Sequence, residues 1–219
     1  MRKQPLITGQ YYHIYNRGVD KRDIFMNKND LDRFILSIIK FNIVNPTGGI
    51  KELFLVKNNI SGVGHLKVEE KQLVSIVCYC INPNHFHFIL KQEQDGGISE
   101  FMKRLLGGYT NYFNQTYDRS GALFQGRFKS HMIATDRYFL KIYPYVNVNY
   151  LVHDIPDEKK YLIRASDMEY EENVFNLVSK KEADNLLEFY GGLENFKEEC
   201  KNVVEMTREE RGKDPIFLE

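Results

Sequence analysis

Two histidines, His85 and His87, stand two positions apart in an apolar run that follows Asn82-Pro83-Asn84. In a β-strand alternate side chains point to the same side, so both imidazoles face one way, about 6–7 Å apart along the strand. Two imidazoles at this spacing can share a divalent metal ion. A polar ring in an apolar strand also serves as an ordinary hydrogen-bonding residue, and the pair alone does not separate the two interpretations.

A second pair of polar residues lies within residues 143–149, where Tyr145 precedes Asn149 by four positions. On a helix this spacing places both side chains on one face, with a phenol beside an amide. A free phenol ionises only near pH 10, so a tyrosine nucleophile needs a base or a metal ion. A buried core tyrosine explains the same spacing. Other tyrosines that could take the nucleophile's role are Tyr143, Tyr138 and Tyr112.

The elements that would position these groups follow from residue patterns. Strand-forming aromatics occupy residues 11–16, and apolar runs at 73–81 and 85–90 flank a turn at residues 82–84, which predicts an antiparallel hairpin. Apolar residues recur at helical spacing in three segments, and aromatic and β-branched residues from 124 to 133 suggest one or two further strands. We expect the three helices to be capped by Asn29, Ser99 and Asp136.

Pro144 would interrupt a continuous third helix, so we expect that helix to restart at Pro144 and to run toward Tyr150. The predicted order β, α, β, β, α, β, α indicates an α+β fold, a ferredoxin-like antiparallel sheet with packed helices. Residues 44–70 form an inserted loop or small hairpin. We divide the chain into a catalytic domain at 1–155 and an acidic, mostly helical extension at 156–219, with helices at 180–190 and 193–204.

Composition limits the class of protein. The chain has 219 residues, of which 42% are hydrophobic, enough for a folded core. It contains no apolar run long enough for a membrane span or secretory signal, and its three cysteines suit a reducing compartment, so we expect a cytoplasmic protein without a membrane partner. Residues 1–155 hold 20 Lys and Arg against 13 Asp and Glu, a basic body suited to phosphates.

Several ordered motifs together carry a family resemblance. They are Tyr12-His13-Ile14-Tyr15-Asn16-Arg17-Gly18, Asn82-Pro83-Asn84-His85-Phe86-His87, Gly121 to Ser130, and Tyr145-Val146-Asn147-Val148-Asn149. Over residues 10–155 the chain resembles the HUH single-tyrosine transposases, and within them the REP-associated tyrosine transposase branch. The resemblance implies single-stranded DNA as substrate, with hairpin or repeat-element ends, in a prokaryotic, nucleoid-associated setting.

The resemblance also implies roles for individual residues. His85 and His87 would bind a divalent ion, usually Mg²⁺ or Mn²⁺, and Tyr145 would be the nucleophile that forms a 5′-phosphotyrosine link. Asn149 would be the third ligand, where relatives often have Gln. His13 would support the metal site or bind substrate. Some relatives are homodimers in which the tyrosine helix completes the partner's site.

Several basic residues are predicted to contact DNA. Arg127 and Lys129, in the strand that matches the family, are the strongest, and Lys103, Arg104 and Arg17 are further candidates. His65, His131 and His153 belong to no motif.

Two competing interpretations stay open. One is a non-catalytic nucleic-acid-binding module with RRM-like topology, in which the sheet binds single strands and the histidines do no chemistry. The other is a structural zinc site formed by Cys78 and Cys80 with His85 and His87.

Overall fold

The computed structural model describes residues 5–46, 71–153 and 155–209 of the chain. Its sheet has the strand order β4-β1-β3-β2-β5, and every strand pair in it is antiparallel. The first four strands follow the ferredoxin-like order, which confirms the predicted α+β fold. The strands are β1 (Tyr11–Arg17), β2 (Val74–Asn82), β3 (His85–Gln92), β4 (Lys129–Met132) and β5 (Arg164–Ala165).

Helices lie on both faces of this sheet. The α-helices are α1 (Lys28–Phe41), α3 (Gly97–Thr116), α4 (Asp136–Asn147), α5 (Ser166–Glu172), α6 (Lys180–Tyr190) and α7 (Leu193–Glu209). Short 3-10 turns are η1 (Val19–Lys21), η2 (Asn149–Leu151) and η3 (Asp157–Leu162). In the part of the chain that the structure describes, no helix has the length and apolarity of a membrane span.

The hairpin of β2 and β3 forms as predicted, with Pro83 and Asn84 as its two-residue turn. This turn pairs Asn82 with His85 and Cys80 with His87. Since opposite residues in a sheet point to the same face, the register places Asn82 beside the histidine pair. The predicted inserted loop lies mainly in residues 47–70, outside the described residues.

The predicted helix caps were each wrong by one to three positions. The α1 cap is Asn27, whose side-chain oxygen accepts hydrogen bonds from the backbone N–H groups of Asn29 and Asp30. Gly96, in a left-handed conformation, precedes α3, and Thr135 caps α4. Several polar residues stand near each start, and residue type alone did not select the one with extended or left-handed backbone.

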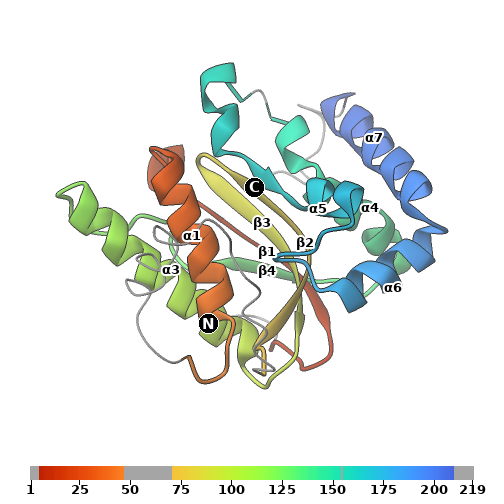
Figure 1. Ribbon diagram of the computed structural model, residues 1–219, viewed down its shortest axis with the longest axis horizontal. Coiled ribbons are helices and arrows are strands. Elements are labelled where there is room, and N and C mark those ends of the chain that lie inside the picture. The colour runs from red at the N-terminus through yellow and green to blue at the C-terminus, as the bar shows by residue number, and fades with distance from the viewer. Residues whose placement is uncertain (1–4, 47–70, 154, 210–219) are drawn as a thin grey trace.

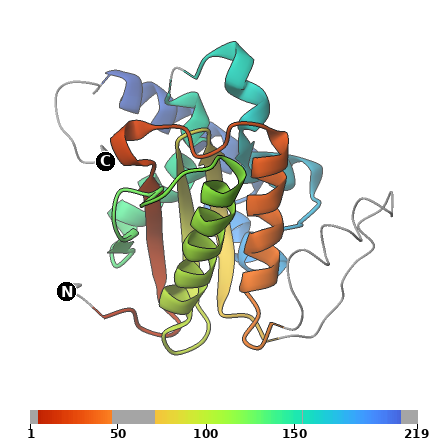
Figure 2. The ribbon, with the colours of Figure 1, turned by 90° about the vertical axis from the view of Figure 1, so that its left-hand side faces the viewer.

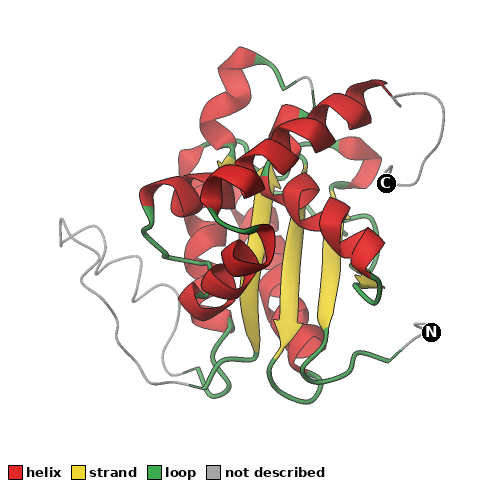
Figure 3. Ribbon diagram, turned by 90° about the vertical axis from the view of Figure 1, so that its right-hand side faces the viewer, coloured by secondary structure: helices red, strands yellow, loops and turns green. Residues whose placement is uncertain are grey.

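Two helical layers cover the sheet. Figure 2 shows α1 and α3 in front of one face, where Phe34 of α1 packs on Phe86 of β3 with ring centroids 5.8 Å apart. The opposite face carries α4 and α6, which both contact β2, and α7 packs against α4 (Figures 1 and 3). Because strand side chains alternate, Phe86 and Phe88 enter the first layer while His85 and His87 face α4.

Helix α4 runs unbroken through Pro144, so the expected restart at this residue is wrong. Proline has no N–H to donate to Leu140, four residues earlier. The Leu140 carbonyl instead accepts a hydrogen bond from the Tyr190 hydroxyl of α6 at 3.1 Å. The C-terminal segment thus satisfies the backbone group that the proline leaves open.

Helix α4 ends at Asn147, earlier than expected. Val148 has non-helical dihedral angles, and Asn149 begins the separate 3-10 turn η2. Tyr145 and Asn149 therefore do not share one helical face. Asn149 still reaches the histidine strand because the turn redirects its side chain.

The segment after Ile155 packs closely on the preceding body. Its strand β5 pairs with β2, and α7 lies along α4. The predicted helices at 180–190 and 193–204 correspond to α6 and α7. The domain boundary after Ile155 stays a prediction.

Candidate active site

Strand β3 and the segment from α4 to η2 bring the four predicted residues of one chain together. The rings of His87 and Tyr145 lie 5.8 Å apart and perpendicular, and Nε2 of His85 lies 3.1 Å from Oδ1 of Asn149. All four are buried, from 0% exposed at Asn149 to 5% at His85. The arrangement is therefore assembled within a single chain.

The proton position on His85 follows from its neighbours. Its Nδ1 lies 2.6 Å from Oδ1 of Asn84, an acceptor, so Nδ1 carries the proton and donates it. Nε2 is then a lone-pair nitrogen, and it accepts from the Asn82 amide at 2.9 Å. The turn that begins β3 thus fixes the His85 tautomer that a metal ligand requires.

Asn82 also donates to Oδ1 of Asn149 at 2.9 Å. Two lone-pair atoms, His85 Nε2 and Asn149 Oδ1, therefore converge on one donor amide. The Nδ2 atom of Asn149 is buried without a hydrogen-bond partner among the described residues. The contacts of its oxygen therefore orient the Asn149 side chain, and its amide nitrogen does not contribute.

The pair fits a divalent cation. Two ligands at right angles on an octahedral ion, each about 2.1 Å from it, are separated by about 3 Å, close to the 3.1 Å between His85 Nε2 and Asn149 Oδ1. An amide oxygen suits Mg²⁺ or Mn²⁺ while imidazoles also suit later transition metals, so the ligands do not by themselves select the ion.

His87 is held from the other side by His13. The Nδ1 atom of His87 lies 2.8 Å from Nε2 of His13, and the two rings are nearly parallel. Burial, followed by the charges of His87 and His131, lowers the pKa of His13 well below its usual value. A neutral His13 can accept from His87 while its Nδ1 lies 3.4 Å from the Tyr138 hydroxyl.

The alternative tyrosines differ in their surroundings. Tyr112 donates to Asp30 in the layer of α1 and α3, across the sheet from the histidine pair. Tyr143 is 1% exposed and its ring packs on Phe139. Tyr138, next to His13, is the alternative that lies nearest the site, and burial raises its pKa.

The predicted DNA contacts divide between the two layers. Lys129 lies on β4 and Arg17 ends β1, on the face of the histidine pair, and Arg127 is exposed just before β4. Lys103 and Arg104 lie on α3, behind the sheet. The Arg104 guanidinium binds Glu100 and the Ile43 carbonyl, so it supports the fold locally.

Sequence patterns missed three neighbours of the site. Asn82 and Asn84 looked like turn residues, and only the hairpin register, with Asn82 opposite His85, reveals their place. His153 belongs to no motif, yet its ring centroid is 4.6 Å from that of His85. No pattern predicts this contact, because it depends on how η2 redirects the chain.

The zinc interpretation is not supported. Among residues 5–46, 71–153 and 155–209, no three His, Cys, Asp or Glu side chains gather as a metal-binding group. Both Cys78 and Cys80 are fully buried, and burial raises the pKa of each thiol, which disfavours the thiolate that binds zinc.

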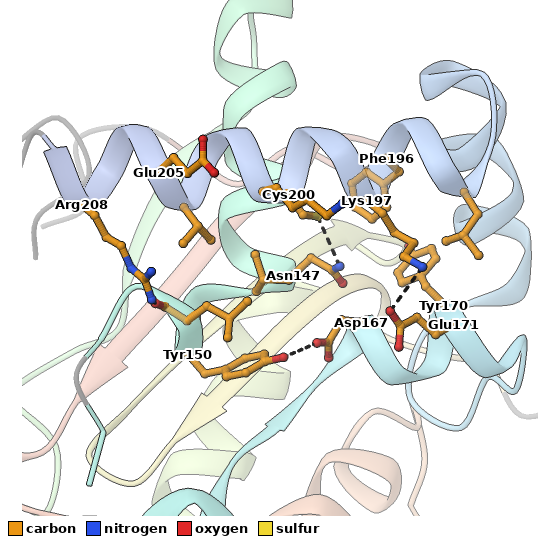
Figure 4. A pocket seen from close by; sticks show the side chains of 15 residues that line it. Asn147, Tyr150, Asp167, Tyr170, Glu171, Phe196, Lys197, Cys200, Glu205 and Arg208 are labelled. Atoms are coloured by element: carbon orange, nitrogen blue, oxygen red, sulfur yellow. Dashed lines mark hydrogen bonds and ion pairs between the residues drawn. The ribbon is translucent and has the colours of Figure 1, made fainter. Parts of the chain in front are cut away.

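A cavity of about 300 Å³ lies beyond the end of α4, between η2, α5 and α7 (Figure 4). Asn147 donates to the Cys200 sulfur, and Tyr150 donates to Asp167 at 2.6 Å. These bonds anchor the turn that carries Asn149 to the C-terminal helices. The cavity is thus next to the candidate site but separate from it.

Comparison with known protein families gives a match over part of the chain. Residues 65–149 match the family model described as "Transposase IS200 like", a range that includes His85, His87, Tyr145 and Asn149. This segment is therefore similar to the IS200-like transposases. The family match supports an enzyme that acts on DNA, in agreement with the resemblance to single-tyrosine transposases.

No curated protein sequence matches the chain. Among solved structures, the chain is similar to one described as a REP-associated tyrosine transposase bound to a REP hairpin. The two are 13% identical, with a TM-score of 0.48, over 82% of this chain and 90% of that one.

Proposed function

We propose that this IS200-like protein cleaves and rejoins single-stranded DNA through a covalent link to Tyr145. The observation that carries the proposal is the contact of Tyr145 with His87, in a site where His85 and Asn149 present converging lone pairs. A structural tyrosine would not require this juxtaposition of a phenol, two imidazoles and an amide oxygen.

The proposed cleavage and rejoining reaction needs no cofactor as a source of energy. A bond forms between the Tyr145 hydroxyl oxygen and the scissile phosphorus, and the bond from phosphorus to the 3′ oxygen breaks. The phenol loses a proton and the 3′ oxygen gains one. Because the phosphotyrosine is still an ester, a 3′-hydroxyl can attack it and rejoin the strand.

His85, His87 and Asn149 would hold the divalent cation that the family generally requires. When bound, such an ion supplies positive charge to the phosphate oxygens where negative charge develops. Asn84 orients His85 through Nδ1, and His13 orients His87 through Nδ1, so that the Nε2 atom of each could bind the ion. The Asn82 amide, which donates to both His85 Nε2 and Asn149 Oδ1, would have to release them when the ion binds. Mg²⁺ and Mn²⁺ are the ions we propose.

The substrate has to open this site, since Tyr145 is 3% exposed. A phosphate can approach the phenol only after neighbouring side chains move. His153 beside His85 and Tyr138 beside His13 are two of these neighbours. We infer that DNA binding shifts them outward.

The partner we propose is single-stranded DNA with hairpin or repeat-element ends, bound in the prokaryotic cytoplasm near the nucleoid. Arg127, Lys129 and Arg17 flank the site on its open side and would contact phosphates. Lys103 and Arg104 stay predictions, and so does a homodimer. Tyr145 and the histidine pair meet within one chain, so a dimer is not needed to complete the site.

A denaturing gel tests the proposal. The protein is incubated with Mn²⁺ and a labelled pool of single-stranded DNA hairpins with randomised flanks. Wild-type protein and Tyr138→Phe should form a denaturant-resistant adduct, whereas Tyr145→Phe should form none. An adduct that persists in Tyr145→Phe would overturn the assignment, and DNA binding without any adduct would favour a non-catalytic binding module.

A further inference from the structure

The sheet face that carries the histidine pair continues past α4 onto β1 and the edge strand β4. Tyr15 lies opposite His87, and Lys129 lies opposite Tyr15. Helix α4 packs on β2 and β3, and its Tyr138 reaches His13 in the middle of β1. Lys129 and His131 are exposed, and Tyr15 is half-buried. We call Tyr15, Arg17, Lys129 and His131 the edge patch.

Aromatic rings form a row across this face. The rings of His87 and Tyr15 are 5.6 Å apart with planes 14° from parallel, and those of Tyr15 and His131 are 5.9 Å apart at 9°. The Tyr15 hydroxyl also lies 3.3 Å from Nε2 of His131. The row therefore begins inside the candidate active site and ends at an exposed ring on the sheet edge.

The edge patch is positively charged. Lys129 and His131 are two positions apart and share one face of β4, about 6–7 Å apart along the strand. The Lys129 ammonium lies 5.6 Å from the Tyr15 ring centroid, and Arg17, opposite His85 in the register, donates to Gln125 at 2.6 Å. Cations beside parallel rings are the combination that binds unpaired nucleotides, through phosphates and bases respectively.

We propose that the edge patch binds the single-stranded nucleotide next to the scissile phosphate. An unpaired base stacks on the outer face of His131, extending the row of rings, and Lys129 binds the adjoining phosphate. The inference rests on the proposed function, because it requires a single-stranded DNA substrate at Tyr145. It assigns a role to His131 and Tyr15, which belong to no catalytic set.

The test separates base contacts from phosphate contacts. Binding is measured by fluorescence anisotropy with the Tyr145→Phe protein, so that no cleavage occurs, and with two labelled probes. One is a 20-nucleotide oligothymidylate, which suits base stacking without a known target sequence. The other is an abasic strand of equal length, which keeps the phosphates and lacks the bases. Variants are His131→Ala, His131→Phe and Lys129→Gln, with Lys201→Gln on α7 as the matched control.

The His131→Ala change should weaken oligothymidylate binding by about 5- to 150-fold, the range measured for one stacked base. It should leave binding of the abasic strand unchanged, and His131→Phe should keep most of the affinity. Lys129→Gln should weaken both probes and lower the slope of log affinity against log salt by about 0.7. Lys201→Gln should change neither.

An equal effect of His131→Ala on both probes, or no effect on either, would overturn this inference while the proposed function stands. Failure of the protein to bind either strand would also overturn this inference, and adduct formation with the hairpin pool then decides separately whether the proposed function stands. Because His131 is exposed, its replacement should not unfold the protein, and unchanged thermal unfolding verifies this.

Discussion

Replacing His13 with phenylalanine should weaken metal binding without removing any metal ligand. The His13 ring lies parallel to those of His87 and Tyr15, with centroids 5.1 Å and 4.8 Å away. Phenylalanine keeps this packing and removes the His13 nitrogen that lies 2.8 Å from Nδ1 of His87, the acceptor that the metal-binding tautomer of His87 requires. His13→Gln is the matched control, because it keeps an acceptor.

The size of the effect follows from burial. His13 is 6% exposed and His87 is 1% exposed, so water does not readily replace the lost partner. A buried N–H without a partner costs about 1–3 kcal/mol. The His87 proton avoids this cost by moving to Nε2, the nitrogen that should face the metal ion. Metal binding then has to reverse the move, which weakens affinity by about 10- to 100-fold, as for other residues that orient a ligating histidine.

Two measurements check the reasoning. Calorimetric titration with Mn²⁺ gives the affinity, and ¹⁵N NMR of the metal-free protein gives the His87 tautomer. Wild type and His13→Gln should carry the proton on Nδ1 of His87, and His13→Phe should carry it on Nε2. If His13→Phe binds Mn²⁺ as tightly as wild type with its His87 tautomer unchanged, then His13 does not position His87.

Three further changes have defined outcomes. Asn149→Gln should retain adduct formation and Asn149→Leu should lose it by at least about 10-fold, as measured by gel; equal activity of the two would exclude an amide ligand. Burial alone would raise the pKa of Glu182, but hydrogen bonds from Lys91 and Tyr11 outweigh burial and lower this pKa. Ionised Glu182 therefore stabilises the fold at pH values above its unfolded pKa, and this stabilisation is lost as the pH falls through the lowered, folded pKa. Urea unfolding should therefore show Glu182→Gln less stable than wild type at pH 7 and a shrinking difference in acid, whereas a constant difference would contradict the linkage. Tyr190→Phe should lower stability by about 0.5–1.5 kcal/mol, the net contribution of its hydrogen bond to the Leu140 carbonyl, and unchanged urea unfolding would argue against this.

Local patterns predicted the parts of the fold that depend on neighbouring residues. The two-residue turn at Pro83 and Asn84 fixes the register of β2 and β3, so the placement of both histidines on one face followed from alternation alone. The ferredoxin-like arrangement could be predicted because few topologies suit the predicted order of strands and helices, whereas the added edge strand β5 was not predicted.

Contacts between distant segments could not be predicted in this way. The Leu140 carbonyl, which Pro144 leaves without its helical donor, accepts from Tyr190, 50 residues away in the chain. Spacing suggested that Asn149 shares a helix face with Tyr145, yet Asn149 reaches His85 from a separate turn. His153 and Tyr15 joined the surroundings of the site only once the tertiary arrangement was known.

The most direct measurement is the identity of the residue that becomes attached to DNA. Wild-type protein is incubated with Mn²⁺ and the hairpin pool, digested with nuclease and protease, and sequenced by mass spectrometry. We expect one modified peptide, with a nucleotide 5′-phosphate on Tyr145 and a free 3′-hydroxyl on the released strand. A modification on Tyr138, or a 3′-phosphate link to any tyrosine, would contradict this expectation.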